Sequence, residues 1–134
     1  MSEKVEITHI PEPEGVRPGN GYTNVVTGTG RLVTVAGQIA LDPEGNLVGE
    51  GDPEAQARQV FENLRRCLGS AGVGFDEVVK LTYFVTDVAY LPAIRKVRDE
   101  YVDTARPPAS SAVQVAALFR PDLLLEIEAF ALAP

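Results

Sequence analysis

The chain contains few of the side chains that build metal centres and disulfide bonds. Its 134 residues include one cysteine, Cys67, one histidine, His9, and no tryptophan. A single cysteine cannot form an intrachain disulfide, and one cysteine with one histidine cannot supply a Cys/His metal cluster. The sequence also lacks a glycine-rich phosphate loop, a zincin motif and a nucleophile elbow. We therefore expect neither a metal nor another cofactor.

Positive charge is also scarce in this sequence. Lysine and arginine total 12 against 19 acidic residues, which gives a formal net charge of −7 at pH 7. This balance disfavours nucleic acid as a partner, because contacts to phosphates need clustered cations. No apolar run approaches the length of a membrane span, and residues 1–6 lack the apolar core of a signal peptide. We expect a cytoplasmic protein with no membrane partner, and the lone cysteine agrees with a reducing compartment.

The residues that are abundant predict one folded domain over residues 1–134. Apolar residues make up 45% and charged residues 23% of the chain, which are ordinary values for a globular protein. β-Branched and alternating segments predict strands at 4–10, 22–27, 31–36, 78–86, 110–118 and 124–132. The Gly28-Thr29-Gly30 segment predicts a hairpin turn that joins the second of these strands to the third.

Two segments have helical periodicity. Asp52 and Pro53 suit the N-cap and first position of a helix whose apolar stripe runs from Ala57 to Ala71. A second stripe extends from Tyr90 to Tyr101. The order of elements is one strand, two strands, a helix, a strand, a helix and two strands. This order predicts an α+β fold with both helices on one face of an antiparallel or mixed sheet.

The other face of the predicted sheet has an apolar surface that needs cover. It would carry the following residues: Leu32, Phe84, Ala112, Ala116 and Phe130. Soluble monomers rarely expose so broad an apolar patch, and closed homo-oligomers are the usual solution. Clefts between the subunits of such an oligomer are natural ligand sites.

Strand alternation also sorts the polar residues of the last two strands. We expect Ser110 and Ala112 on the face without helices, and Val113 under the helices. Glu126 and Glu128 are expected on the face without helices, about 7 Å apart along their strand. Neighbouring carboxylates raise each other's proton affinity when they are partly desolvated, which suits acid–base catalysis. The alternative is an ordinary solvated strand face.

Three further residues are candidates for ligand binding. Gly37 leaves room for a ligand at the end of its strand, although an ordinary strand-end glycine has the same pattern. Tyr22 follows a glycine-rich loop and suits either a ligand contact or core packing. Arg95 lies between apolar positions of the second helix, either on a solvated basic face or beside a cleft.

Several motifs together resemble the Rid (YjgF-type) family, whose better-known members are enamine and imine deaminases. The similarity runs from about residue 22 to residue 132 and is carried by these segments: Val35-Ala36-Gly37-Gln38-Ile39, Ala55-Gln56-Ala57-Arg58-Gln59, Asn63-Leu64, Ala71-Gly72, Val79-Lys80-Leu81-Thr82 and Glu126-Ile127-Glu128-Ala129. The resemblance implies a chorismate-mutase-like α+β fold and a homotrimer. In such a trimer three sheets form an inner barrel, with three ligand clefts at the subunit interfaces.

The resemblance also implies site residues, some of which are replaced in this sequence. In the deaminating members a Pro-Ala-Arg-Ser-Cys-Val segment holds the substrate carboxylate through its arginine. Here that segment has Ser110 at the arginine position and Ala112 at the cysteine position. Tyr22, Gly37 and Glu126 persist, and Glu126 matches the glutamate that orients the attacking water.

Two arginines offer a substitute cation for the missing one. Arg95 stands where those members commonly have an asparagine, and Arg106 precedes Ser110 in a loop. Ala36 replaces the serine of the family's Ser-Gly-Gln motif.

Three functions fit the sequence to different degrees. The first is hydrolysis of a small enamine or imine, with Glu126 and Tyr22 as catalytic residues and Ser110, Gly37, Ala112 and Arg95 binding the substrate. The second is a trimer that binds a small metabolite without turning it over. The third is RNA cleavage or translation inhibition, a label that some family members carry, and the net charge of −7 argues against it.

Overall fold

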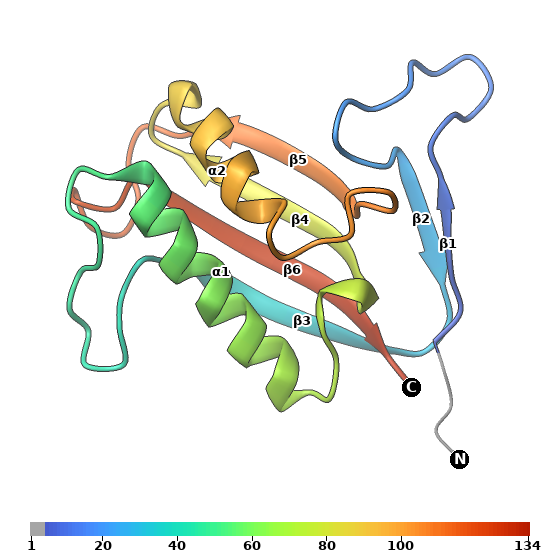
Figure 1. Ribbon diagram of the computed structural model, residues 1–134, viewed down its shortest axis with the longest axis horizontal. Coiled ribbons are helices and arrows are strands. Elements are labelled where there is room, and N and C mark those ends of the chain that lie inside the picture. The colour runs from blue at the N-terminus through green and yellow to red at the C-terminus, as the bar shows by residue number, and fades with distance from the viewer. Residues whose placement is uncertain (1–4) are drawn as a thin grey trace.

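The computed structural model describes residues 5–134, which form a four-stranded sheet, two helices and a separate two-stranded ribbon (Figure 1). The strands and helices are, in chain order, β1 (Ile7–Ile10), β2 (Val25–Gly28), β3 (Arg31–Gln38), α1 (Pro53–Ser70), β4 (Val78–Val85), α2 (Leu91–Arg98), β5 (Ala109–Gln114) and β6 (Leu125–Ala133). Two short 3-10 turns, η1 (Phe75–Glu77) and η2 (Val88–Tyr90), precede β4 and α2. The predicted order of elements is confirmed, with residue 4 of the first predicted strand outside the described residues.

The main sheet is mixed and has the order β3-β6-β4-β5. β6 pairs antiparallel with both β3 and β4, whereas β4 and β5 are parallel and are joined through α2. Both helices lie on the same face of the sheet (Figure 1). The expected α+β architecture, with its helices on one side of a mixed sheet, is therefore confirmed.

Helix α1 forms because its first turn is capped and one of its faces is apolar. The Asp52 carboxylate accepts a hydrogen bond from the backbone N–H of Ala55 at 3.1 Å, and Pro53 occupies the first turn. Phe61, Leu64 and Leu68 are completely buried. They form one core with the alternate residues of β6, from Leu125 to Ala133, that point toward the helices. The predicted N-cap and apolar stripe are thus confirmed.

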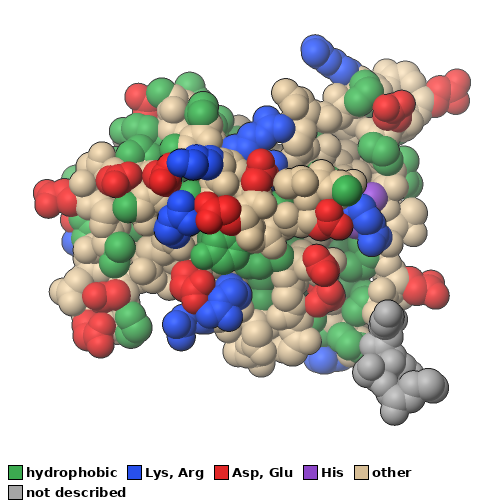
Figure 2. Space-filling view, viewed as in Figure 1, with side chains coloured by type: hydrophobic (Ala, Val, Ile, Leu, Met, Phe, Trp, Pro, Cys, Tyr) green, Lys and Arg blue, Asp and Glu red, His purple; other side chains and the backbone are tan. Residues whose placement is uncertain are grey.

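The outer side of the helices is polar and carries both signs of charge. Figure 2 shows acidic and basic side chains interleaved over this side of the molecule. Arg58, for example, donates to the Glu100 carboxylate at 2.8 Å, and Lys96 donates to Glu54 at 2.9 Å. Neither helix in the described part of the chain is long and apolar enough to cross a membrane.

The hairpin predicted around Gly28-Thr29-Gly30 is wrong, because β2 pairs with β1 and not with β3. Of the two favoured two-residue hairpin turns, type I′ needs positive φ at both central residues and type II′ needs it at the first, which here is Thr29. Here only Gly30 of the three has positive φ, at +133°. The chain therefore turns away at this point, and the β1–β2 ribbon stands apart from the main sheet (Figure 1).

The face predicted for Ser110 and Ala112 is also wrong. In the parallel pairing of β5 with β4, Ser110 lies opposite Leu81 and Ala112 lies opposite Tyr83. Paired residues point to the same side of a sheet, and Leu81 and Tyr83 are buried beneath the helices. Ser110 and Ala112 therefore face α2, whereas Val113 is on the uncovered face and is 45% exposed. The prediction placed the apolar Val113 under the helices. In the structure β5 is an edge strand, and its residues that face the helix are small.

The uncovered face of the sheet keeps the apolar surface predicted from the sequence. Leu32 lies opposite Leu132, Phe130 lies opposite Thr34, and Leu32 is 66% exposed. Phe84 shares this face with the glutamates of β6. Ala112 and Ala116 do not belong to it, since Ala112 faces α2 and Ala116 follows the end of β5.

Candidate functional site

Four of the predicted site residues meet in one cleft between α2 and the edge strand β5. The cleft has a volume of about 350 Å³ and its lining includes Tyr22, Arg95, Ser110 and Ala112. This is within the size range of small-molecule sites, near its lower end. The remaining lining residues come from the loop before Tyr22, from β4 and from α2: Asn20, Tyr83, Leu91, Pro92, Ile94 and Arg98.

Two arginines of α2 fasten the Tyr22 loop to this cleft. The Arg98 guanidinium donates to the carbonyl of Gly21 at 2.6 Å and to the Asp99 carboxylate at 2.7 Å, and the residue is 8% exposed. Arg95 donates to the Asn20 side-chain oxygen at 3.2 Å. Its guanidinium lies against Gly21, where a side chain at φ +81° would collide with it. A glycine is therefore required for this close approach.

The floor of the cleft contains a tyrosine that sequence reasoning missed. Tyr83 comes from β4 and is 5% exposed, and its hydroxyl has no hydrogen-bond partner within the described residues. Burial raises the pKa of Tyr83 to about 12, although the nearby Arg98 charge acts in the opposite direction. The sequence shows β4 as apolar on both faces, so only the strand pairing reveals that Tyr83 lies beside Ala112.

The other two predicted site residues, Glu126 and Gly37, lie on the opposite face of the sheet. Between the Val35–Ala129 and Gln38–Ile127 pairs, β3 has one more residue than β6, which forms a bulge at Gly37. The Glu126 side chain occupies the space that a side chain at Gly37 would fill. An added Cβ at Gly37 would lie 2.6 Å from the Glu126 carboxyl carbon.

A single protomer therefore does not bring the six predicted site residues together. Tyr22, Arg95, Ser110 and Ala112 form one group beside α2, and Glu126 with Gly37 forms a second group on the uncovered face. Each group contains part of the predicted machinery: the first has Tyr22 and three of the predicted binding residues, and the second has the Glu126 carboxylate and Gly37.

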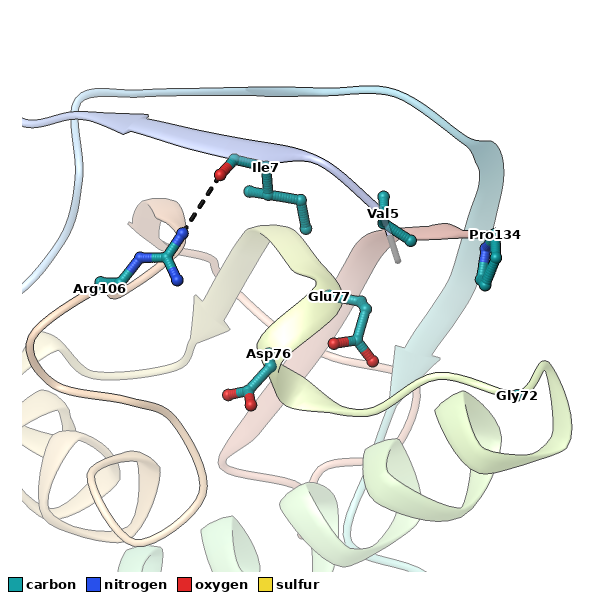
Figure 3. Close-up of a pocket in the computed structure, with 7 residues that line it drawn as sticks. All are labelled: Val5, Ile7, Gly72, Asp76, Glu77, Arg106 and Pro134. Atoms are coloured by element: carbon teal, nitrogen blue, oxygen red, sulfur yellow. Dashed lines mark hydrogen bonds between the residues drawn. The ribbon is translucent and has the colours of Figure 1, made fainter. Parts of the chain in front are cut away.

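The second candidate cation, Arg106, is directed elsewhere. It donates to the carbonyl of Ile7 at 3.2 Å (Figure 3). It also approaches the His9 ring at 3.4 Å. Burial and the Arg106 charge lower the pKa of His9. Arg106 borders a hollow of about 460 Å³ between β1 and η1, where Asp76 and Glu77 also lie (Figure 3). Arg106 thus holds the β1 strand and does not line the cleft of Ser110.

We found no cluster of three or more His, Cys, Asp or Glu side chains suited to a metal ion in residues 5–134. Cys67 is half-buried and packs against the core from α1.

Comparison with known proteins identifies close relatives over nearly the whole chain. The family described as Endoribonuclease L-PSP matches residues 14–133. A RutC family protein from Synechocystis is 40% identical over 131 residues, covering 97% of this chain and 95% of that protein. The 3-aminoacrylate deaminase RutC of Acinetobacter baylyi is 37% identical over 119 residues, covering 89% of this chain and 93% of that enzyme.

A solved structure has the same fold. The Rid-family protein from Yersinia pestis superimposes with a TM-score of 0.84 at 37% identity, covering 92% of this chain and 97% of that one. The resemblance predicted from the sequence motifs is thereby confirmed, and the chain belongs to the Rid (YjgF-type) family, whose profile carries the description Endoribonuclease L-PSP.

Proposed function

We propose that this protein is a cytoplasmic homotrimer that hydrolyses a small enamine or imine in clefts between its subunits. The observation that carries the proposal is the separation of the two groups of site residues on opposite faces of one sheet. A second copy whose uncovered face meets the cleft beside β5 supplies Glu126 to Tyr22 and Ser110. The deaminase activity named for the Acinetobacter baylyi relative supports the same reaction class.

The uncovered face itself favours self-association. Leu32, Phe84, Phe130 and Leu132 give it an apolar character, and Leu32 is 66% exposed. Burying exposed apolar area stabilises an assembly by roughly 25 cal/mol per Å². In a closed ring of three copies, every subunit has this apolar face covered by a neighbour.

In the proposed reaction Glu126 positions and activates a water molecule. An enamine first takes up a proton on its β-carbon while its nitrogen gives up a proton, and this exchange forms the neutral imine. The water then attacks the imine carbon, its protons pass to the nitrogen, and ammonia leaves as the carbonyl forms. Tyr22, Ser110, Ala112 and Arg95 hold the substrate, while the missing side chain at Gly37 leaves room beside the carboxylate. The protein supplies mainly positioning and proton transfer.

Ammonia release from an enamine generated in situ tests the proposal. Removing a general base typically lowers the rate by about 10²-fold or more, so we expect Glu126→Gln to lose most of its activity. Glu128→Gln is the matched control, because Glu128 lies two residues along the same strand and face. Equal rates for wild type and Glu126→Gln, no faster than buffer, would refute the proposed hydrolysis.

A non-catalytic trimer that binds a small metabolite is the second candidate function. The replacements at Ser110, Ala112 and Ala36 favour it, because they remove charge and reactivity from the site. Under this alternative, keto acids, amino acids or neutral metabolites raise the melting temperature and are recovered chemically unchanged.

RNA cleavage, which the family description names, has less support. The net charge of −7 opposes polyanion binding, and the chain has a single histidine, His9. Steeply salt-dependent RNA binding would favour this function over the other two.

A further inference from the structure

The hollow between β1 and η1 brings together segments that are far apart in the sequence (Figure 3). Val5 and Ile7 line it from β1 and the residues just before that strand. Asp76 and Glu77 line it from η1, and Arg106 lines it from the loop before β5. Its volume of about 460 Å³ is within the range of small-molecule sites. It shares no described lining residue with the cleft beside α2, so it is a second and separate cavity.

The hollow carries both signs of charge, and these charges do not pair with each other. Arg106 reaches toward β1, whereas the carboxylates of Asp76 and Glu77 project from η1 (Figure 3). The salt bridges within residues 5–134 all lie elsewhere and include none of these three side chains. A molecule that has its own cation and its own anion can therefore lie between the two sides and pair with both.

Each of the three charged groups keeps hydrogen-bonding capacity for a ligand. Arg106 uses only Nη2, which donates to the Ile7 carbonyl and approaches the His9 ring, so Nε and Nη1 have no partner in the described part of the chain. Oε1 of Glu77 accepts a backbone N–H at 2.9 Å, which fixes this side chain and leaves Oε2 without a donor among residues 5–134. The Asp76 carboxylate is exposed beside it. The hollow thus offers donors on one side and acceptors on the other.

Apolar side chains complete the hollow. Val5 and Ile7 lie beside the charged groups and face into it (Figure 3). Apolar surface next to a few polar groups that fix orientation is typical of a small-molecule site. An α-amino acid carries a carboxylate, an ammonium group and a side chain on one carbon, so it matches all three kinds of surface. A ligand with a single charge is attracted by one side of the hollow and repelled by the other.

We propose that the hollow between β1 and η1 binds a free α-amino acid with an apolar side chain. Arg106 binds the carboxylate of this ligand, and Asp76 and Glu77 bind its ammonium group. The ligand's side chain packs against Val5 and Ile7. The proposed catalytic carboxylate and the cleft beside α2 take no part, so this site does not depend on the proposed hydrolysis.

Leucine and two of its analogues test the proposal by calorimetry at neutral pH. Isocaproate is leucine without the ammonium group, and isoamylamine is leucine without the carboxylate. Each analogue loses one charge-assisted hydrogen-bonded pair and leaves an opposite charge of the hollow without a partner. We therefore expect wild type to bind leucine at least about tenfold more tightly than either analogue.

Substitutions should remove the two preferences separately. The double variant Asp76→Asn/Glu77→Gln keeps an oxygen for the backbone N–H that Glu77 accepts, and it should bind leucine and isocaproate about equally. Arg106→Gln should instead remove the preference for leucine over isoamylamine, and Arg106→Lys should restore part of it. Asp103→Asn is the matched control, because Asp103 lies close to Arg106 and does not line this hollow. It should keep both preferences.

Amide chemical shifts of the isotope-labelled protein locate the bound leucine, because the cleft beside α2 also contains arginines. We expect leucine to shift the amide signals of Ile7, Gly72 and Glu77, which border the hollow. The proposal is overturned if none of these three signals moves and the changes are confined to Ser110 and Ala112 in the cleft. It is also overturned if leucine does not bind, if either analogue binds as tightly, or if the double variant keeps the preference for leucine over isocaproate.

Discussion

Replacing Gly37 with alanine should disable the site while leaving the fold intact. The added Cβ would lie 2.6 Å from the carboxyl carbon of Glu126 and 2.8 Å from its Cγ. Carbon atoms in contact are normally about 3.5–4 Å apart, so the carboxylate must retreat by about 1 Å. A displacement of this size can cost about 10²-fold in rate, which corresponds to about 2.7 kcal/mol of barrier.

The cost to stability should be much smaller. Gly37 does not have positive φ, so alanine fits the backbone there. The group that moves belongs to a flexible side chain, and a strained rotamer costs about 0.5–1.5 kcal/mol. Urea unfolding measures this quantity, and ammonia release from an enamine measures the rate. Gly69→Ala is the control, because a Cβ at Gly69 meets nothing within 4 Å. Activity of Gly37→Ala within twofold of wild type would show that the position of Glu126 does not matter.

Three further predictions concern the framework around the site. Gln56 is fully buried, donates to the carbonyls of Gly49 and Asp122 and accepts from the Leu124 N–H. Each buried polar group left without a hydrogen-bond partner costs about 1–3 kcal/mol, so Gln56→Leu should lower the free energy of unfolding by at least about 3 kcal/mol. A loss below about 1 kcal/mol in urea unfolding would contradict this. Leu32→Asp should reduce the mass in sedimentation to that of one protomer with an unchanged circular dichroism spectrum, whereas an intact oligomer would count against the proposed interface. The pKa of Tyr83 rises from 10.0 to about 12 on folding, so its contribution to stability is complete below pH 10 and is lost as the pH rises through about 12. Wild type should therefore lose up to about 3 kcal/mol more than Tyr83→Phe over this interval, and parallel urea curves at pH 9 and pH 12 would show the reasoning to be wrong.

The elements and their order follow from local patterns, so the sequence predicts them well. The cap at Asp52 and the buried stripe of α1 depend on neighbouring residues along one helix, and so does the alternation along β6. These local patterns match the structure because each of these segments packs one face against the same core.

Features that depend on partners distant in sequence were missed or misplaced. The face of Ser110 is fixed by its register against Leu81, and alternation within β5 alone does not reveal which of its two faces lies under α2. The pairing of β2 with β1 depends on the backbone at Gly30. Tyr83 has the pattern of a core residue, and only its position opposite Ala112 makes it the base of a cleft.

The division of the candidate site between two faces of one sheet has a genetic consequence. In the proposed site between two subunits, one subunit contributes Glu126 and the other contributes Ser110. A mutation at Glu126 and a mutation at Ser110 therefore inactivate different contributions to the site. Assemblies mixed from the two inactive chains contain some sites in which both contributions are intact. Co-expression of the inactive Glu126 variant with the inactive Ser110 variant should restore part of the activity. The fraction of activity restored measures how the two kinds of subunit are distributed among the assemblies.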